Sequence, residues 1–290
     1  MIKKTEAALS KEVFAGKSKI FSKYGPTAII LGATEGIGWA FAEELAESGF
    51  NLYMISRRQS ALDKRTADLQ ARFGIKAVGI VIDLSRPDPW KVIKDEIKEE
   101  EYGLVIYNAA ASPIGSFLDL NLESARKTVS VNVASPLDVV HGAGNELRMR
   151  YKQTGKRGGI MLLSSLTGFR GTPNVSAYGA TKSWNINLAE GAGTEMKSEG
   201  VDLMVCVAGA TDTPGYRDSI TKGSVSPMQK PEAVAREALR KLGHKNVMIP
   251  GFKNRVIAAL VYKLIPRSWA CYIFSRATSS LRKRFDAGQF

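Results

Sequence analysis

A tyrosine and a lysine four residues apart are the side chains of this 290-residue chain that most directly indicate chemistry. Tyr178 and Lys182 lie in SAYGATKSWNINLAE, and Ser165 ends the apolar run IMLLSS further upstream. On a helix, residues i and i+4 share one face, so the phenol and the ammonium should point into one pocket. A nearby ammonium favours phenolate and lowers the tyrosine pKa from about 10. The pattern predicts proton exchange with a carbonyl or carbinol oxygen that Ser165 holds, which is oxidoreductase chemistry beside a bound hydride carrier.

A glycine-rich turn predicts the site of that carrier. The segment TAIILGATEGIGWAFAEELAESG begins as a strand, turns through Gly32, Gly36 and Gly38, and continues as an amphipathic helix. Gly32 permits a tight turn, Gly36 lets backbone amides approach a pyrophosphate, and Gly38 lets the helix pack on its strand. The positive end of the helix dipole then faces the phosphates. The spacing is GxxxGxG, and such turns also occur for structural reasons alone, but the Tyr178–Lys182 pair favours nucleotide binding.

These two motifs together resemble the short-chain dehydrogenase/reductase family, over about residues 26 to 215. The resemblance implies a catalytic tetrad in which Asn132, from VSVNVAS, joins Ser165, Tyr178 and Lys182. It assigns Asn132 to a water that connects Lys182 to solvent, and it lets Lys182 bind the nicotinamide ribose. Besides Tyr178, Lys182 and the three glycines, the implied cofactor contacts are Thr34, Glu35 and Ile37 in the turn, Asp83 and Leu84 beside the adenine, Asn108, Ala109 and Ala110 after the run LVIY, and Gly209, Thr211 and Thr213 beside the nicotinamide.

Four positions depart from the family pattern. Leu31 replaces the threonine before the first glycine, and Ala208 replaces a proline before Gly209. Tyr107 and Ala110 flank Asn108 and Ala109 where the family usually has asparagine and glycine. None of these changes removes a member of the tetrad, so the predicted chemistry stands.

The end of the second strand-like run predicts which nicotinamide cofactor binds. NLYMIS ends at Ser56 and is followed by Arg57 and Arg58, where a binder of NAD would place an acidic residue for the ribose 2′-hydroxyl. A guanidinium suits a 2′-phosphate, and a serine can add a hydrogen bond. The pattern favours NADP, with Arg57 as the main contact. The alternative is that both arginines only solvate the start of a helix.

Alternating strand-like and helical runs predict the fold. The chain is 44% hydrophobic and shows no repeats, which suits one large domain. We expect an α/β fold, a single Rossmann-type doubly wound parallel sheet with helices on both faces, because its strands are almost continuously apolar. Gly191 and Gly193 in one helix suggest close packing against another helix, in this subunit or a partner's. The strand-like runs are AIIL, NLYMI, AVGIVI, LVIY, IMLLS, LMVCVA and NVMIP.

The residues available as ligands argue against a metal site. Only Cys206 and Cys271 are thiols, and His141 and His244 are far apart in the chain. The first sixteen residues contain charge but no apolar core of a secretory signal. We therefore expect no bound metal and a cytoplasmic protein.

The net charge of +13 is concentrated at the two ends of the chain. We divide the sequence into a basic N-terminal extension (1–25), a dinucleotide-binding catalytic domain (26–250) and a basic, partly apolar C-terminal extension (251–290). The C-terminal extension holds eight Lys or Arg against one Asp. Its apolar runs are too short to span a bilayer. They are expected to close the substrate pocket or form a subunit interface, or alternatively to contact a membrane surface. No basic and aromatic strand motif supports nucleic-acid binding.

The sequence as a whole predicts an NADPH-dependent carbonyl reductase that assembles as a homodimer or homotetramer. KIFSKYGPTAIILGAT and ISRRQSALDK are similar to the branch of 17β-hydroxysteroid dehydrogenases and 3-ketoacyl reductases, which implies a hydrophobic ketone such as a ketosteroid or 3-ketoacyl derivative. Two alternatives stay open. One is an epimerase or dehydratase of the same fold, and the other is a cofactor-binding scaffold or sensor.

Overall fold

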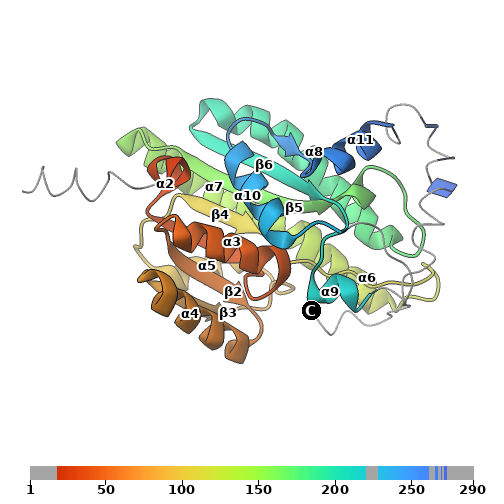
Figure 1. Cartoon of the computed structure of the whole chain (residues 1–290), viewed down its shortest axis with the longest axis horizontal. Coiled ribbons are helices and arrows are strands. Elements are labelled where there is room, and N and C mark those ends of the chain that lie inside the picture. Colours follow the sequence, from red (N-terminus) through yellow and green to blue (C-terminus); the bar gives the residue numbers. More distant parts are fainter. Residues whose placement is uncertain (1–17, 220–227, 261–264, 267–268, 270, 273–290) are drawn as a thin grey trace, which may run out of the picture.

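A seven-stranded parallel sheet forms the centre of the molecule (Figure 1). The computed structural model describes residues 18–260 except 220–227, together with residues 265–266, 269 and 271–272. The strand order is β3-β2-β1-β4-β5-β6-β7, so the chain reverses direction across the sheet between β1 and β4. This order confirms the predicted doubly wound α/β fold. The strands are β1 (Thr27–Leu31), β2 (Asn51–Ser56), β3 (Ala77–Val81), β4 (Leu104–Tyr107), β5 (Gly158–Ser165), β6 (Val201–Ala208) and β7 (Val247–Met248).

Helices cover both faces of the sheet and form two separate cores. One core lies under α2 (Lys19–Tyr24), α3 (Gly36–Glu47), α4 (Gln59–Phe73) and α10 (Pro231–Lys241). The other lies under α5 (Pro89–Ile97), α7 (Ser135–Thr154) and α8 (Ser176–Ser198). The remaining helices are α6 (Leu122–Val129), the π-helix η1 (Ser130–Ala134), the 3-10 helix η2 (Leu166–Gly168), α9 (Pro214–Arg217) and α11 (Phe252–Ala259).

The apolar strands contribute side chains to both cores. Every residue of β1, β4 and β6 is buried. Within β1, Ile30 belongs to the core under α3, whereas Ile29 and Leu31 belong to the core under α7. Alternate side chains of a strand point to opposite faces, so a strand covered on both faces must be apolar throughout. The prediction drawn from the continuous apolar runs is therefore confirmed.

The N-terminal helix α2 packs on the body of the protein. The rings of Phe21 and Phe50 contact edge to face with centroids 5.1 Å apart, and Tyr24 is buried. The first described residues therefore pack on the same body as the strands. Residues 1–17 of the predicted extension lie outside the described residues.

The two glycines of α8 have different surroundings. A methyl group added at Gly193 would lie 2.9 Å from the carbonyl oxygen of Leu203 in β6. Nothing lies within 4 Å of a methyl group added at Gly191. Packing within the subunit accounts for Gly193 only. Among the described helices, none has the length and apolar content needed to cross a bilayer.

Candidate active site

One cavity of about 580 Å³ lies at the carboxyl ends of the strands and collects almost all of the predicted site residues. Open α/β sheets bind their ligands at this edge, next to the point where strand order reverses. Of the predicted residues, only Gly38 and Asn132 do not line the cavity.

The glycine turn has the geometry that nucleotide binding requires. Gly32 has φ +82°, in the left-handed region, and a methyl group there would lie 2.7 Å from the amide nitrogen of Ala109. A methyl group at Gly38 would overlap the carbonyl oxygen of Gly32, so α3 can start this close to β1 only without a side chain. Asn108 Nδ2 donates to the same carbonyl over 2.7 Å and joins the ends of β1 and β4. The turn brings the N-terminus of α3 to the cavity, where backbone N–H groups can bind phosphate.

The segment after β6 closes over this turn. A methyl group added at Gly36 would lie 2.9 Å from Cγ2 of Thr213, although the two residues are far apart in the sequence. Gly209 lies against the side chain of Asn254 from α11, 2.5 Å from where its methyl group would be. Gly36, Gly209, Thr211 and Thr213 therefore surround one end of the cavity together.

Ser56, Arg57 and Arg58 line the cavity where β2 ends. Arg58 pairs with Glu35 at 2.8 Å, and its NH2 group lies 3.4 Å from Thr34 Oγ1. Arg57 forms no hydrogen bond or ion pair with any part of the chain that the structure describes. Its guanidinium is available to a ligand phosphate, whereas that of Arg58 already has a carboxylate partner.

A lysine that the sequence did not indicate adds positive charge beside this region. Lys127, from α6, lines the cavity. Burial acts to raise the pKa of the Asp83 carboxyl, but hydrogen bonds from Ser85 and the charges of Lys127 and Arg57 outweigh it and leave that pKa below its ordinary value. Lys127 is far from Asp83 and Arg57 in the sequence, and no motif marks it, so only the fold places it here.

The predicted catalytic side chains Ser165, Tyr178 and Lys182 line the same cavity. Lys182 Nζ lies 5.5 Å from the centroid of the Tyr178 ring, and it donates to the carbonyl oxygen of Leu163 over 2.7 Å. Burial raises the pKa of Tyr178 to about 12, although a hydrogen bond with Ser165 acts to lower it. Burial also lowers the pKa of Lys182 to about 7.

These pKa values correct one prediction. The sequence indicated that the ammonium of Lys182 lowers the pKa of Tyr178, whereas the tyrosine pKa is raised. Desolvation disfavours the charged form of each group, and it exceeds the effect of one group on the other. At neutral pH the tyrosine is a protonated phenol, and the lysine is divided between its charged and neutral forms.

Asn132 lies behind the cavity and is fully buried. Its Oδ1 accepts from the Ala111 amide over 2.8 Å, while Nδ2 donates to the Ala111 carbonyl over 2.8 Å and to Thr181 Oγ1 over 3.0 Å. The side chain therefore ties η1 to the segment after β4 and to α8. The resemblance implies that the Asn132 side chain holds a water. In the structure its amide group forms hydrogen bonds with protein groups instead.

Tyr107, one of the positions that depart from the family pattern, supports this same region. Its hydroxyl donates to the Val131 carbonyl in η1 over 2.6 Å, and burial raises its pKa. The substituted residue thus forms a new connection between the end of β4 and the π-helix that carries Asn132.

Known proteins resemble this chain in both sequence and structure. A family model described as short chain dehydrogenase matches residues 26–223. The chain belongs to the short-chain dehydrogenase family. Like its relatives in that family, it is an oxidoreductase.

The relatives include enzymes with named substrates. The chain is 31% identical over 238 residues to a 7beta-hydroxysteroid dehydrogenase of Mediterraneibacter gnavus, across 80% of this chain and 89% of that protein. It is 30% identical over 229 residues to a very-long-chain 3-oxoacyl-CoA reductase of Neurospora crassa, across 77% of this chain and 66% of that protein. A solved structure concerning 7beta-hydroxysteroid dehydrogenase stereoselectivity superimposes with a TM-score of 0.79 and 26% identity, covering 89% of this chain and 99% of the other.

In this short-chain dehydrogenase the segment after β6 is only partly described. Tyr216, in α9, lines the cavity. Arg217, also in α9, pairs with Asp212, with NH2 2.6 Å from Oδ2.

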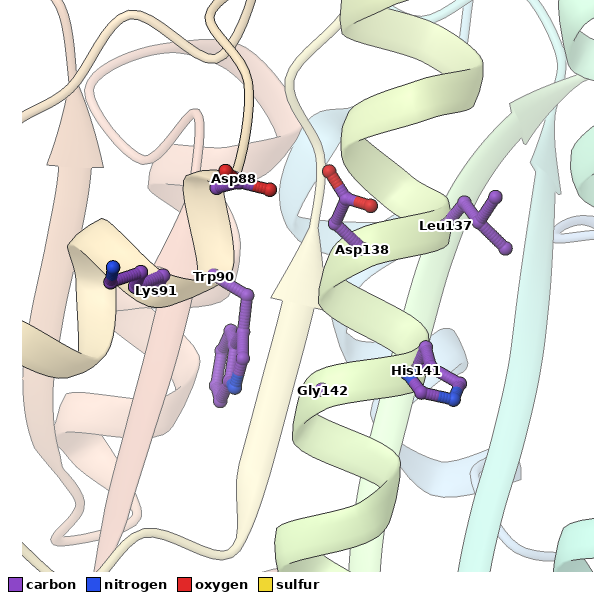
Figure 2. Close-up of a pocket in the computed structure, with 7 residues that line it drawn as sticks. All are labelled: Asp88, Trp90, Lys91, Leu137, Asp138, His141 and Gly142. Carbon is purple, nitrogen blue, oxygen red and sulfur yellow. The ribbon is translucent and has the colours of Figure 1, made fainter.

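A second, smaller hollow lies between α5 and α7 of this dehydrogenase (Figure 2). Asp88, at the start of α5, lies opposite Asp138 of α7, and Leu137 and His141 of α7 also line the hollow. Burial and the nearby charge of Asp88 raise the pKa of Asp138, while His141 acts to lower it. None of the tetrad residues or the glycines of the turn lines this hollow, so it is separate from the active site. Within the described part of the chain no three His, Cys, Asp or Glu side chains gather as metal ligands.

Proposed function

We propose that this short-chain dehydrogenase is an NADPH-dependent carbonyl reductase that converts a hydrophobic ketone to an alcohol. One observation carries the proposal: Ser165, Tyr178 and Lys182 line the same cavity as the glycine turn. The turn suits a dinucleotide because side chains at Gly32 or Gly38 would collide with Ala109 or with the Gly32 carbonyl, so only glycines let α3 start this close to β1 and turn its N-terminus to the cavity. The bound nicotinamide supplies a hydride to the carbonyl carbon.

The protonation states suit the direction of reduction. Tyr178, with a pKa of about 12, holds its proton at neutral pH and can donate it to the carbonyl oxygen as the alcohol forms. Ser165 positions that oxygen by hydrogen bonding. The Nζ of Lys182 uses one donor on Leu163 and keeps others for the ribose hydroxyls. Asn132 acts as a positioning residue, because it fixes α8 through Thr181.

The preference for NADPH is supported by Ser56 and Arg57, with Lys127 nearby. The 2′-phosphate would meet an unpaired guanidinium at the end of β2, where the chain has no acidic residue for a bare ribose hydroxyl.

We predict that Arg57→Ala raises the KM for NADPH by about 10-fold to 100-fold, the loss of one charge-assisted phosphate contact. The KM for NADH should change by less than about threefold. Steady-state kinetics with both cofactors checks this, with Arg72→Ala as the control, because Arg72 is an exposed arginine that pairs with Glu43. Equal losses with both cofactors would exclude a 2′-phosphate role for Arg57.

The substrate class is supported by the lining of the cavity and by the relatives. Ile114, Val131, Leu166, Val175 and Tyr216 contribute apolar surface beside Tyr178. The relatives are named for hydroxysteroids and for very-long-chain 3-oxoacyl thioesters. Both classes combine a carbonyl or carbinol with a large apolar body, as this lining requires.

The deciding experiment follows NADPH oxidation with ketosteroids, long-chain 3-oxoacyl thioesters, quinones and small aldehydes. We expect turnover with one of the two hydrophobic classes and at least about tenfold lower kcat/KM with small aldehydes, because apolar contacts are lost. Isomerised or dehydrated product without net NADPH consumption would instead support the epimerase or dehydratase alternative. Cofactor binding without turnover of any compound would support the scaffold alternative.

A homodimer or homotetramer is part of the proposal. Gly191 has no neighbour within 4 Å of an added methyl group and leaves a small-residue position open on α8. A partner helix could approach closely at that position. Sedimentation velocity on the purified chain measures the assembly directly.

A further inference from the structure

The helix α11 packs one side on the protein and exposes large apolar residues on the other side. On the inner side Ala258 is buried, and Asn254 Nδ2 donates to Gln229 Oε1 over 2.7 Å and to the Pro250 carbonyl over 3.1 Å. On the outer side Phe252 is 73% exposed and Leu260, just after the helix, is 50% exposed. A helix whose apolar residues face away from its own protein marks an interaction surface.

Four large apolar residues form this outer face, which we call the α11 face. They follow the spacing i, i+4, i+5 and i+8, which lies along one side of a helix. Trp269 and Tyr272, shortly after the helix, are 70% and 62% exposed. Figure 1 shows α11 (blue) on the opposite side of the molecule from α2 (red). The α11 face consists of Phe252, Val256, Ile257 and Leu260.

The sequence that contains and follows the α11 face is strongly basic. Residues 251–290 hold eight Lys or Arg against one Asp, a net charge of +7. Lys253 is exposed on α11 itself, whereas Arg255 pairs with Glu237 at 2.6 Å. Two copies meeting through this face would bring two such basic segments together, and their like charges would oppose the contact. An anionic surface would be attracted to the same segment.

We propose that the α11 face docks on an anionic phospholipid bilayer. An interfacial helix of this kind buries its apolar residues at the boundary of headgroups and acyl chains, while nearby Lys and Arg contact the headgroups. Tryptophan and tyrosine are the side chains enriched at that depth of a bilayer.

The same helix contacts the active site, so docking would orient the cavity. Asn254 lies against Gly209, which lines the cavity, and bonds to Gln229. Gln229 in turn pairs through its backbone with Ala210 and Asp212, over 2.9 and 2.8 Å. A protein docked through α11 would hold the segment after β6 close to the membrane surface, where an apolar substrate is concentrated.

The test is sedimentation of the full chain with vesicles of phosphatidylcholine, with or without about one-third phosphatidylglycerol. We expect binding to the anionic vesicles and little to the neutral ones. The double variant Phe252→Ser/Ile257→Ser should lose binding by at least about tenfold. The control Leu137→Ser/Met149→Ser changes two exposed apolar residues of α7 (47% and 50% exposed) and should bind as the wild type does.

A charge variant and a mass measurement complete the test. Arg282→Gln/Lys283→Gln should weaken binding to anionic vesicles, whereas Lys64→Gln/Lys91→Gln on α4 and α5 should not. The proposal is overturned if wild-type protein binds neither kind of vesicle. It is also overturned if the Phe252 and Ile257 variant binds normally, or if that variant lowers the mass of the assembly in sedimentation velocity, because α11 is then a subunit interface. None of these outcomes depends on carbonyl reduction.

Discussion

Clusters of similar residues lie at the two ends of strands β5 and β6. They differ in whether their charged side chains have partners of opposite charge. At the carboxyl end, Ser165, Tyr178 and Lys182 meet in the active-site cavity. At the amino end, Tyr24, Arg157 and Lys23 surround Asp202. Each cluster has a buried tyrosine and a lysine, but only the amino-end cluster contains a carboxylate.

The amino-end cluster is fully satisfied. Asp202 accepts from Arg157 NH2 over 2.7 Å and from the Tyr24 hydroxyl over 2.7 Å, and it pairs with Lys23 at 2.9 Å. Burial acts to raise the pKa of Asp202, but these three partners outweigh it and lower the pKa to about 2. The charged carboxylate is therefore the stable form throughout the physiological range.

The active-site cluster has no opposite charge to offset burial. Lys182 donates to the neutral Leu163 carbonyl, and burial lowers its pKa to about 7. Holding such a group costs stability, and proteins accept this cost where a reactive group must meet a ligand. The comparison teaches that the pairing of charges, rather than the residue types, separates the structural cluster from the proposed catalytic one.

The largest expected effect is the loss of turnover in Tyr178→Phe. Removal of the proton donor should lower kcat by about 10²-fold to 10⁴-fold, the usual contribution of general acid catalysis. NADPH affinity and the melting temperature should remain close to wild type. Stopped-flow fluorescence and thermal unfolding measure these, and near-normal kcat would remove tyrosine from proton transfer.

The second effect concerns stability at the other end of the strands. Asp202→Asn should lower the free energy of unfolding by about 3 kcal/mol, because it leaves Arg157 and Lys23 without their carboxylate. The kcat of the folded variant should change less than about twofold. Urea unfolding measures the first quantity. The control is Glu44→Gln, which breaks the exposed pair with Arg236 and should cost below about 1 kcal/mol.

The opposite result for these two variants would contradict the distinction between the two clusters. If Asp202→Asn lowered kcat as strongly as Tyr178→Phe while the protein kept its stability, the amino-end cluster would have a catalytic function.

The smallest effect is the pH dependence of stability, which should appear in a different pH range for each cluster. The Lys182 pKa is lower in the folded state than its ordinary 10.5, so the unfolded chain binds more protons from about pH 7 to 10.5, and stability rises with pH there. Wild type should gain about 2 kcal/mol relative to Lys182→Met between pH 6 and 9. The contribution of Asp202 is present above its ordinary pKa of 3.8 and is lost as pH falls toward about 2.

Urea unfolding across this pH range compares each variant with wild type. A difference between wild type and Lys182→Met that is independent of pH would show that Lys182 stays charged in the folded protein. In that case an interaction in the folded protein would stabilise the charged form of Lys182 against burial.

Local patterns in the sequence determined the fold and most of the lining of the cavity. Continuous apolar runs predict strands that are buried on both faces, and all seven predicted runs contain a strand. The turn around Gly32 and the Tyr178–Lys182 pair are predictable because their geometry depends on residues only a few positions apart. The carboxyl ends of parallel strands lie at one edge, so motifs that follow successive strands must converge there.

Tertiary structure alone decided the electrostatics and the supporting contacts. The pKa of Tyr178 depends on how completely the folded chain excludes water, which no spacing of residues reveals. Lys127 reaches the cavity, Tyr107 bonds to the Val131 carbonyl, and Asn132 bonds to Ala111 and Thr181 through contacts that only the fold creates. The Asp202 cluster likewise joins residues from three separate segments of the chain. Local geometry depends on residues that are close together in the sequence. Desolvation and long-range pairing arise only when distant segments of the chain pack together.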